Sequence, residues 1–167
     1  NTIVSLEPSL DDWCEWALKN EMPANLIAFL RFRPKLISDF KATREIKNSP
    51  CPRTWASVGT WMNCGVTDLE VWGGDVGEGA ATEFFSFNDM ASKLPSLDAI
   101  LLNPKKSEVP KEASLRYAVS CGLAAKITEQ NFRLAIEYLD RLPDEFNVMS
   151  VRDALKMNPK LQHTHDF

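Results

Sequence analysis

The residues best suited to chemistry lie where a proline-containing loop turns into a helix, in the run Asn-Ser-Pro-Cys-Pro-Arg-Thr-Trp that starts at Asn48. Pro52 suits the first helical position, because it has no N–H to leave unpaired and its φ is already helical. Arg53 then falls in the first turn, where unpaired backbone N–H groups and the helix dipole attract anions, phosphate above all. Its guanidinium adds a permanent charge and a planar fork of donors. The pattern predicts an anion site at Arg53; the alternative interpretation is a solvated surface arginine.

The helix that must position Arg53 has one apolar face. Trp55, Val58 and Met62 follow at spacings i, i+3 and i+7, which place them on one side of a helix. Gly65 is suited to the left-handed conformation that ends many helices. We therefore expect a helix that ends just before Gly65, is anchored by its apolar face and holds Arg53 rigidly.

The chain contains no pattern of a self-contained enzyme. Neither Gly-x-Ser-x-Gly nor His-Glu-x-x-His occurs. Gly77 and Gly79 do not form a phosphate-binding loop, because no Lys-Ser or Lys-Thr follows them. The two histidines, His163 and His165, lie among the last five residues, and we predict no metal site there because chain ends fray. Dipole compensation at helix starts explains the paired carboxylates Asp11–Asp12 and Asp144–Glu145.

Composition indicates an ordinary globular protein. The chain has 167 residues, 44% hydrophobic and 25% charged, which suits one domain or one domain with a smaller attached piece. The net charge of −4 argues against nucleic-acid binding over the whole surface. A basic cluster interleaved with aromatic residues would suit a local nucleic-acid site, although the solvated end of a helix explains it as well. The cluster comprises Arg31, Arg33 and Lys35, and a nucleic-acid site would also use Lys41 and Arg44.

The sequence carries no mark of a membrane or exported protein. No apolar run approaches the ~20 residues of a membrane-spanning helix, and no signal peptide is present. Four cysteines lie far apart without a Cys-x-x-Cys pair, which favours free thiols in a reducing cytosol over a disulfide or zinc framework. We therefore expect a cytoplasmic protein. The cysteines are Cys14, Cys51, Cys64 and Cys121.

Helical periodicity dominates the chain. The predicted fold is an all-α, multi-helix bundle with at most one short strand, at residues 2–6. Two regions are expected: residues 1–65, and an added helical module over residues 66–167 with a charged linker at 104–110. The chain begins without Met, in an apolar run, which suggests a fragment of a longer protein or a processed chain.

Local patterns give more detailed expectations within this bundle. Ser9 and Thr128 are predicted helix caps, whereas residues 66–75 are expected to be irregular. Helices are expected at about 9–20, 23–32, 52–64, 111–126 and 143–157, and another after Thr128 through Leu139; residues 95–103 are expected to form a short helix or a turn. Small residues are expected to let one helix pack closely, and three phenylalanines after them to fill the core: Gly77, Gly79, Ala80 and Ala81, then Phe84, Phe85 and Phe87.

Several motifs, taken in order, resemble the C-terminal region of one protein family. Pro52-Arg53-Thr54, preceded by Ser49-Pro50-Cys51, is similar to the Ser-Pro-Arg element of MoxR-type AAA+ ATPases. The surrounding motifs resemble one branch, the phage and bacterial MoxR-like ATP-binding proteins. These motifs are Asp12-Trp13 with Trp16-Ala17, the run from Ile27 to Pro34, the run from Val76 to Phe84, Leu142-Pro143-Asp144-Glu145-Phe146, and Val151-Arg152-Asp153-Ala154.

The resemblance implies that the chain is the C-terminal helical lid region of such an ATPase. Arg53 would be its sensor-2 arginine, catalytic in ATP hydrolysis, with Pro52 and Thr54 beside it at the cofactor. The resemblance also implies ATP and Mg²⁺ in the full-length parent, a missing N-terminal AAA+ core and a homo-oligomeric ring. A von Willebrand A-domain protein or another client would be the partner.

The chain departs from the family pattern in two respects. Walker A, Walker B, sensor 1 and the arginine finger are absent from the sequence, so the chain alone is expected to bind no cofactor and to be inactive. Cys51 stands where the family has a serine. Two other hypotheses stay open: a stand-alone helical protein-interaction module, and a nucleic-acid-binding adaptor that uses the basic cluster around Arg31.

Overall fold

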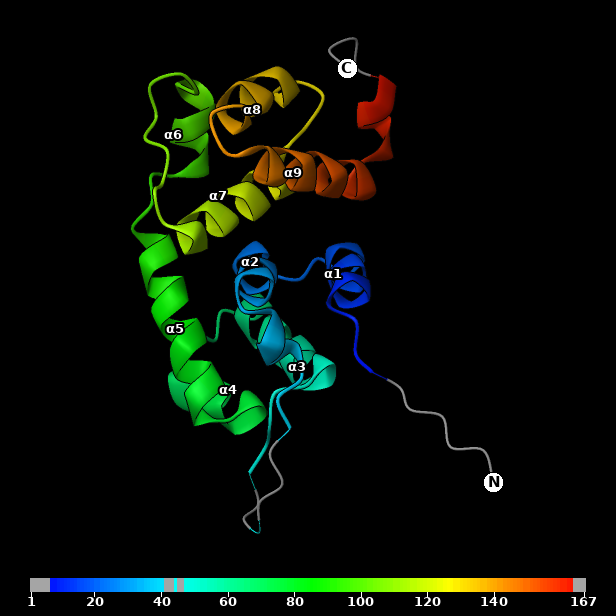
Figure 1. The fold of residues 1–167 in the computed structure, drawn as a ribbon, viewed down its shortest axis with the longest axis vertical. Coiled ribbons are helices and arrows are strands. Elements are labelled where there is room, and N and C mark those ends of the chain that lie inside the picture. The colour runs from blue at the N-terminus through cyan, green and yellow to red at the C-terminus, as the bar shows by residue number, and fades with distance from the viewer. Residues whose placement is uncertain (1–6, 41–43, 45–46, 164–167) are drawn as a thin grey trace, which may run out of the picture.

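Helices make up the whole regular structure of the described chain (Figure 1). The computed structural model describes residues 7–40, 44 and 47–163. These residues contain no strand, which confirms the predicted all-α fold; the strand predicted at residues 2–6 lies outside them. No helix in this part of the chain is long and apolar enough to cross a bilayer. The elements are α1 (Leu10–Lys19), α2 (Ala24–Phe32), η1 (Pro34–Ile37), α3 (Pro52–Asn63), α4 (Leu69–Val76), α5 (Glu78–Ser92), α6 (Leu97–Leu102), α7 (Ala113–Lys126), α8 (Phe132–Leu139), α9 (Asp144–Met157) and η2 (Pro159–His163).

The helix ends predicted at Ser9 and Gly65 are confirmed. Ser9 Oγ accepts a hydrogen bond from the Asp12 N–H at 3.2 Å and so caps α1. Gly65 follows α3 with a φ of +80°, a conformation that a side chain would strain. Both ends depend on residues within a single turn, which is why the local sequence predicts them.

The prediction that residues 66–75 are irregular is wrong, because Leu69–Val76 forms α4. Asp68 caps this helix: its carboxylate accepts hydrogen bonds from two N–H groups of the first turn, at 2.8 and 3.1 Å. One side of α4 packs on the core, where Trp72 is fully buried. The cap and this burial offset the cost of the two consecutive glycines, which is about 1 kcal/mol each relative to alanine.

The predicted cap at Thr128 is also wrong. α8 begins at Phe132, and Asn131 is the residue before it. The Thr128 N–H donates to Asn131 Oδ1 at 2.8 Å, and Asn131 Nδ2 donates to the Lys126 carbonyl at 3.0 Å. The asparagine side chain thus closes the turn after α7, and the helix starts about one turn later than the threonine suggests.

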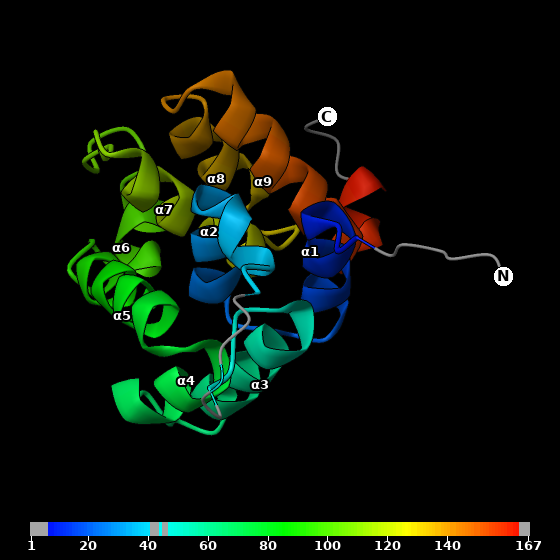
Figure 2. The ribbon, with the colours of Figure 1, turned by 60° about the horizontal axis from the view of Figure 1, so that its bottom comes forward.

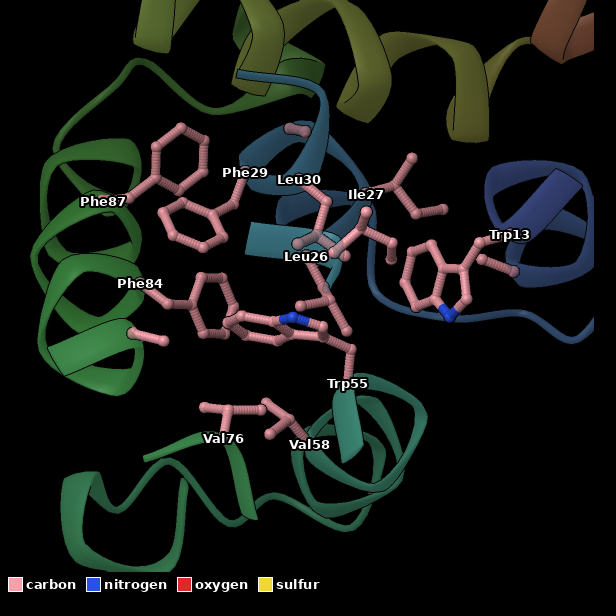
Figure 3. Close-up of a cluster of buried hydrophobic side chains, with 14 of the residues drawn as sticks. Trp13, Leu26, Ile27, Phe29, Leu30, Trp55, Val58, Val76, Phe84 and Phe87 are labelled. Carbon is pink, nitrogen blue, oxygen red and sulfur yellow. The ribbon is translucent and has the colours of Figure 1, made fainter. Parts of the chain in front are cut away.

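The core is built around α2, which lies in the middle of the molecule (Figure 1, Figure 2). Five consecutive residues, Leu26 to Leu30, are buried, so α2 is covered on all sides. The Phe29 ring centroid lies 5.7 Å from that of Trp55, 5.1 Å from that of Phe84 and 5.5 Å from that of Phe87. Figure 3 shows these rings gathered between α2, α3 and α5. Aromatic packing therefore joins the helix that carries Arg53 to the centre of the fold.

α5 presents only part of its predicted apolar set to the core. Phe84 and Phe87 are buried as predicted, whereas Phe85 is 42% exposed. Successive helical residues are rotated by about 100°, so neighbouring side chains cannot share one face. The expectation of close packing at Gly79 is wrong too, because a Cβ on this exposed residue would meet no atom within 4 Å.

A second buried cluster lies among α6, α7, α8, α9 and η2. α7 serves both clusters, since Ala118 and Cys121 belong to the first and Val119 and Leu123 to the second. The predicted division after residue 65 stays a prediction. The first cluster takes side chains from both sides of that point.

The segment at residues 104–110, predicted as a linker, is held against α8. The Tyr138 hydroxyl donates to the Glu108 carbonyl at 2.8 Å, and the Arg141 guanidinium donates to the Pro104 carbonyl. Pro104 itself is buried. The charged composition of this segment therefore reflects exposed side chains on a fixed backbone.

Arg31 forms a buried ion pair with Asp153, and this pair joins α2 to α9. The two side chains are only 9% and 2% exposed. The guanidinium binds both carboxylate oxygens, with Nη2 at 3.1 Å from Oδ1, and Nη1 also donates to Cys121 Sγ at 3.3 Å. Burial raises the pKa of the Cys121 thiol to about 12, which keeps the thiol neutral beside the pair. α2, α7 and α9 thus meet at one polar junction inside an apolar core.

Asp153→Asn should destabilise the protein by about 3–5 kcal/mol, because it leaves the buried Arg31 charge without a counter-ion. Urea unfolding would measure the loss. The matched control is Glu137→Gln, which removes the partner of Lys105 in a surface pair of 2.9 Å and should cost at most about 1 kcal/mol. Equal losses in the two variants would contradict a structural role for the buried pair.

Gly74→Ala should stabilise the protein by roughly 0.5–1 kcal/mol, since alanine favours the helix and its Cβ would meet no atom within 4 Å. Gly77→Ala should instead cost about 1–3 kcal/mol. Gly77 has a φ of +82°, and a Cβ there would lie 3.0 Å from the Asn48 carbonyl oxygen. Thermal unfolding of the two variants would show opposite shifts; shifts of the same sign would refute this account of the α4–α5 turn.

Candidate functional site

The loop that leads into α3 is fixed by a capping arrangement built on Thr54. Cys51 is the N-cap residue in an extended conformation, and Pro52 occupies the first helical position as predicted. Thr54 Oγ1 accepts a hydrogen bond from the Cys51 N–H at 3.0 Å, and its own proton can reach the Ser49 and Cys51 carbonyls at 3.3 and 3.1 Å. The Thr54 hydroxyl is thus engaged within the loop. Its predicted place at a cofactor stays a prediction.

Arg53 lies in the first turn of α3, and its side chain is exposed. Among the described residues it has no hydrogen-bond or ion-pair partner. Pro52 is half-buried, and its carbonyl accepts a hydrogen bond from Trp13 Nε1 at 3.0 Å, which ties the start of α3 to α1. The guanidinium is therefore available to an external anion, on a backbone that is held in place.

The rest of α3 is anchored on two further elements. Trp55 is fully buried, and its Nε1 donates to the Leu36 carbonyl of η1 at 2.6 Å. Ser57 Oγ and Trp61 Nε1 both donate to one carboxylate oxygen of Asp75 in α4, at 2.8 and 3.0 Å. These contacts hold α3 in place behind Arg53. Each is a hydrogen bond from a side chain of α3 to a neighbouring element.

Cys51 places a thiol directly beside Arg53 at the helix N-terminus. Partial burial raises the pKa of this thiol, but hydrogen bonds from Thr54 and from the Arg53 N–H, together with the Arg53 charge, outweigh burial, and the net pKa is lowered. The serine expected at this position by resemblance would offer no ionisable group near physiological pH. The cysteine therefore places an ionisable thiol with a lowered pKa in this loop.

The basic cluster around Arg31 does not form one surface. Arg31 is buried against Asp153, and Arg33 pairs with Glu83 at 2.5 Å. Lys35 and Arg44 are exposed, and Lys41 lies outside the described residues. Arg31 is therefore not available to bind nucleic acid. The sequence did not reveal this, because its partner Asp153 lies far away along the chain.

A groove of about 700 Å³ lies beside this loop, between α4 and α5. Glu70 and Gly74 contribute from α4, Glu78 contributes from α5, and the Asn48 amide closes one side by donating to the Gly74 carbonyl at 2.6 Å. Sequence reasoning missed this groove, because residues 66–75 were not expected to form a helix. The signal that could have revealed it is a run of residues, 66–92, without any Lys or Arg.

Comparisons of the chain with models of protein families, with curated proteins and with solved structures find no match. The candidate site is therefore defined by its own geometry: an exposed, unpaired arginine on a braced helix start, with a groove on the neighbouring helices.

Thr54→Val should raise the pKa of the Cys51 thiol, because it removes a hydrogen bond that favours the thiolate. The thiolate fraction near neutral pH then falls, and Cys51 should react more slowly with iodoacetamide. Mass spectrometry of the alkylated peptides across a pH series would measure this change. The exposed Cys64 of the same chain is the internal control, and its rate should stay constant. An unchanged pH midpoint for Cys51 would show that Thr54 does not set its ionisation.

Proposed function

We propose that this chain is the lid region of a MoxR-like AAA+ ATPase and contributes Arg53 to ATP hydrolysis. The observation that carries the proposal is the exposed, unpaired guanidinium of Arg53 in the first turn of α3. An arginine without a partner among the described residues can place its full charge on a phosphate held by another part of the protein. The ordered motifs that resemble this family support the same proposal.

The residues present suit one contact with a nucleotide rather than a complete site. Phosphoryl transfer spreads negative charge over the oxygens of the transferred group. The planar fork of Arg53 can donate two hydrogen bonds to such oxygens. Walker A and Walker B would hold ATP and Mg²⁺, and in our proposal they belong to an AAA+ core that precedes this region. Pro52 and Thr54 would act by holding the Arg53 backbone in place.

Braced helices suit a lid that must move as one body. The contacts of Trp13, Trp55 and Asp75 fix α3 to α1, η1 and α4, so a force on Arg53 reaches several helices at once. In a ring of identical subunits, such motion could be passed to a neighbouring subunit or to a client such as a von Willebrand A-domain protein. We place this activity in the cytoplasm, where the cysteines would stay reduced.

Arg53→Ala should lower ATP turnover by roughly 100-fold or more in the polypeptide that joins this chain to its ATP-binding core, since removing one preorganised donor has effects of this size. Release of inorganic phosphate would measure turnover, and the matched control is Arg133→Ala, which removes an exposed arginine of α8. Unchanged turnover at an unchanged unfolding midpoint would refute the role of Arg53. A native polypeptide without an ATP-binding core would refute the whole proposal and favour the stand-alone interaction module.

A further inference from the structure

We propose that the groove between α4 and α5 docks a basic, amphipathic peptide segment of a partner protein. The two helices pack side by side at the edge of the molecule (Figure 1, Figure 2). Arg53 does not line the groove, although the loop that leads into α3 borders the groove at Asn48. A chain that binds such a segment need not act on ATP, so the experiments on Arg53 and on the groove can fail separately.

The charge of the groove is the first reason. Residues 66–92 hold six carboxylates and no Lys or Arg. Four of the six have partners within the chain: Asp68 caps α4, Asp75 binds Ser57 and Trp61, Glu83 pairs with Arg33, and Asp89 pairs with Lys93.

The other two carboxylates, Glu70 and Glu78, are the ones that line the groove. Among the described residues neither has a hydrogen-bond or ion-pair partner. Lys47 also lines the groove, at its loop end, and already makes an interaction within the chain. Two negative charges in the groove, one from each helix and neither paired among the described residues, favour a cationic occupant.

Apolar side chains beside these carboxylates are the second reason. Leu69 lines the groove and is 37% exposed, and Phe85 is 42% exposed with its ring 6.1 Å from that of Trp72. Phe85 follows Glu78 by seven residues, so the two lie on the same face of α5. Exposed apolar groups next to unpaired charges are typical of a surface that a protein partner covers.

The glycine at position 74 is the third reason. Gly74 lies inside α4, where glycine weakens a helix, and its position does not require the absence of a side chain for packing. It does leave the wall of the groove as bare backbone, which allows close approach by a ligand. A peptide with Lys or Arg spaced by apolar residues would match all three features, because its cations reach Glu70 and Glu78 while its apolar side chains meet Leu69 and Phe85.

The test is a selection from a phage-displayed library of short random peptides on the immobilised full chain. The double variant Glu70→Gln/Glu78→Gln serves as the counter-target. We expect enriched sequences rich in Lys or Arg and in apolar residues. The most enriched peptide, labelled with fluorescein, should bind the double variant and Leu69→Ala roughly tenfold more weakly than the wild type, by fluorescence anisotropy. Binding should also weaken as NaCl is raised.

Each variant has a matched control elsewhere on the surface. Glu129→Gln/Glu145→Gln removes the same charge, Leu102→Ala removes an exposed leucine of α6, and Gly79→Ala adds a methyl group to an open position outside the groove. These controls should bind like the wild type, whereas Gly74→Ala should bind more weakly although it stabilises α4. The proposal is overturned if no sequence is enriched, if enriched peptides lack Lys and Arg, or if they bind the double variant as well as the wild type.

Discussion

A helix that is apolar on every side must be enclosed, because any uncovered face would leave hydrophobic surface in water. α2 is such a helix, with Leu26 to Leu30 all buried, and α1, α5 and α7 pack around it. The same enclosure explains the Arg31–Asp153 pair. A guanidinium at the end of a buried helix needs a counter-ion in the core, and Asp153 of α9 supplies it. The positions of the surrounding helices follow from covering α2 and from neutralising its one inward charge.

Local signals predicted the parts of the fold that depend on local residues. The all-α class, the cap at Ser9 and the left-handed end at Gly65 each follow from neighbours within a turn. α4 could not be predicted in this way, because its two glycines disfavour a helix and the burial of Trp72 that stabilises it depends on distant residues. Arg31 is the clearest case: its sequence context suggests a solvated helix end, and only the folded chain brings Asp153 beside it.

In the candidate site, too, local features could be predicted from the sequence, whereas contacts between distant residues could not. The sequence located the helix start at Pro52 and Arg53, since proline and helix polarity act within a few residues. It could not show that Arg53 has no partner in the part of the chain that the structure describes. Nor could it show that Trp13 of α1 bonds the Pro52 carbonyl of α3, or that Trp55 of α3 bonds the Leu36 carbonyl of η1. The groove between α4 and α5 could not be predicted from the sequence for a related reason. Whether a carboxylate is paired depends on which cations the fold brings near it.

α7 has a consequence for how the chain can be divided. Its residues Ala118 and Cys121 complete the cluster around α2, while Val119 and Leu123 complete the cluster of the C-terminal helices. A truncation after α6 removes α7, which covers one side of α2, and also removes Asp153, the partner of Arg31. The first hundred residues should therefore not fold on their own. We expect the two clusters, which share α7, to unfold together. A deletion that removes α7 would therefore report on unfolding and not on binding.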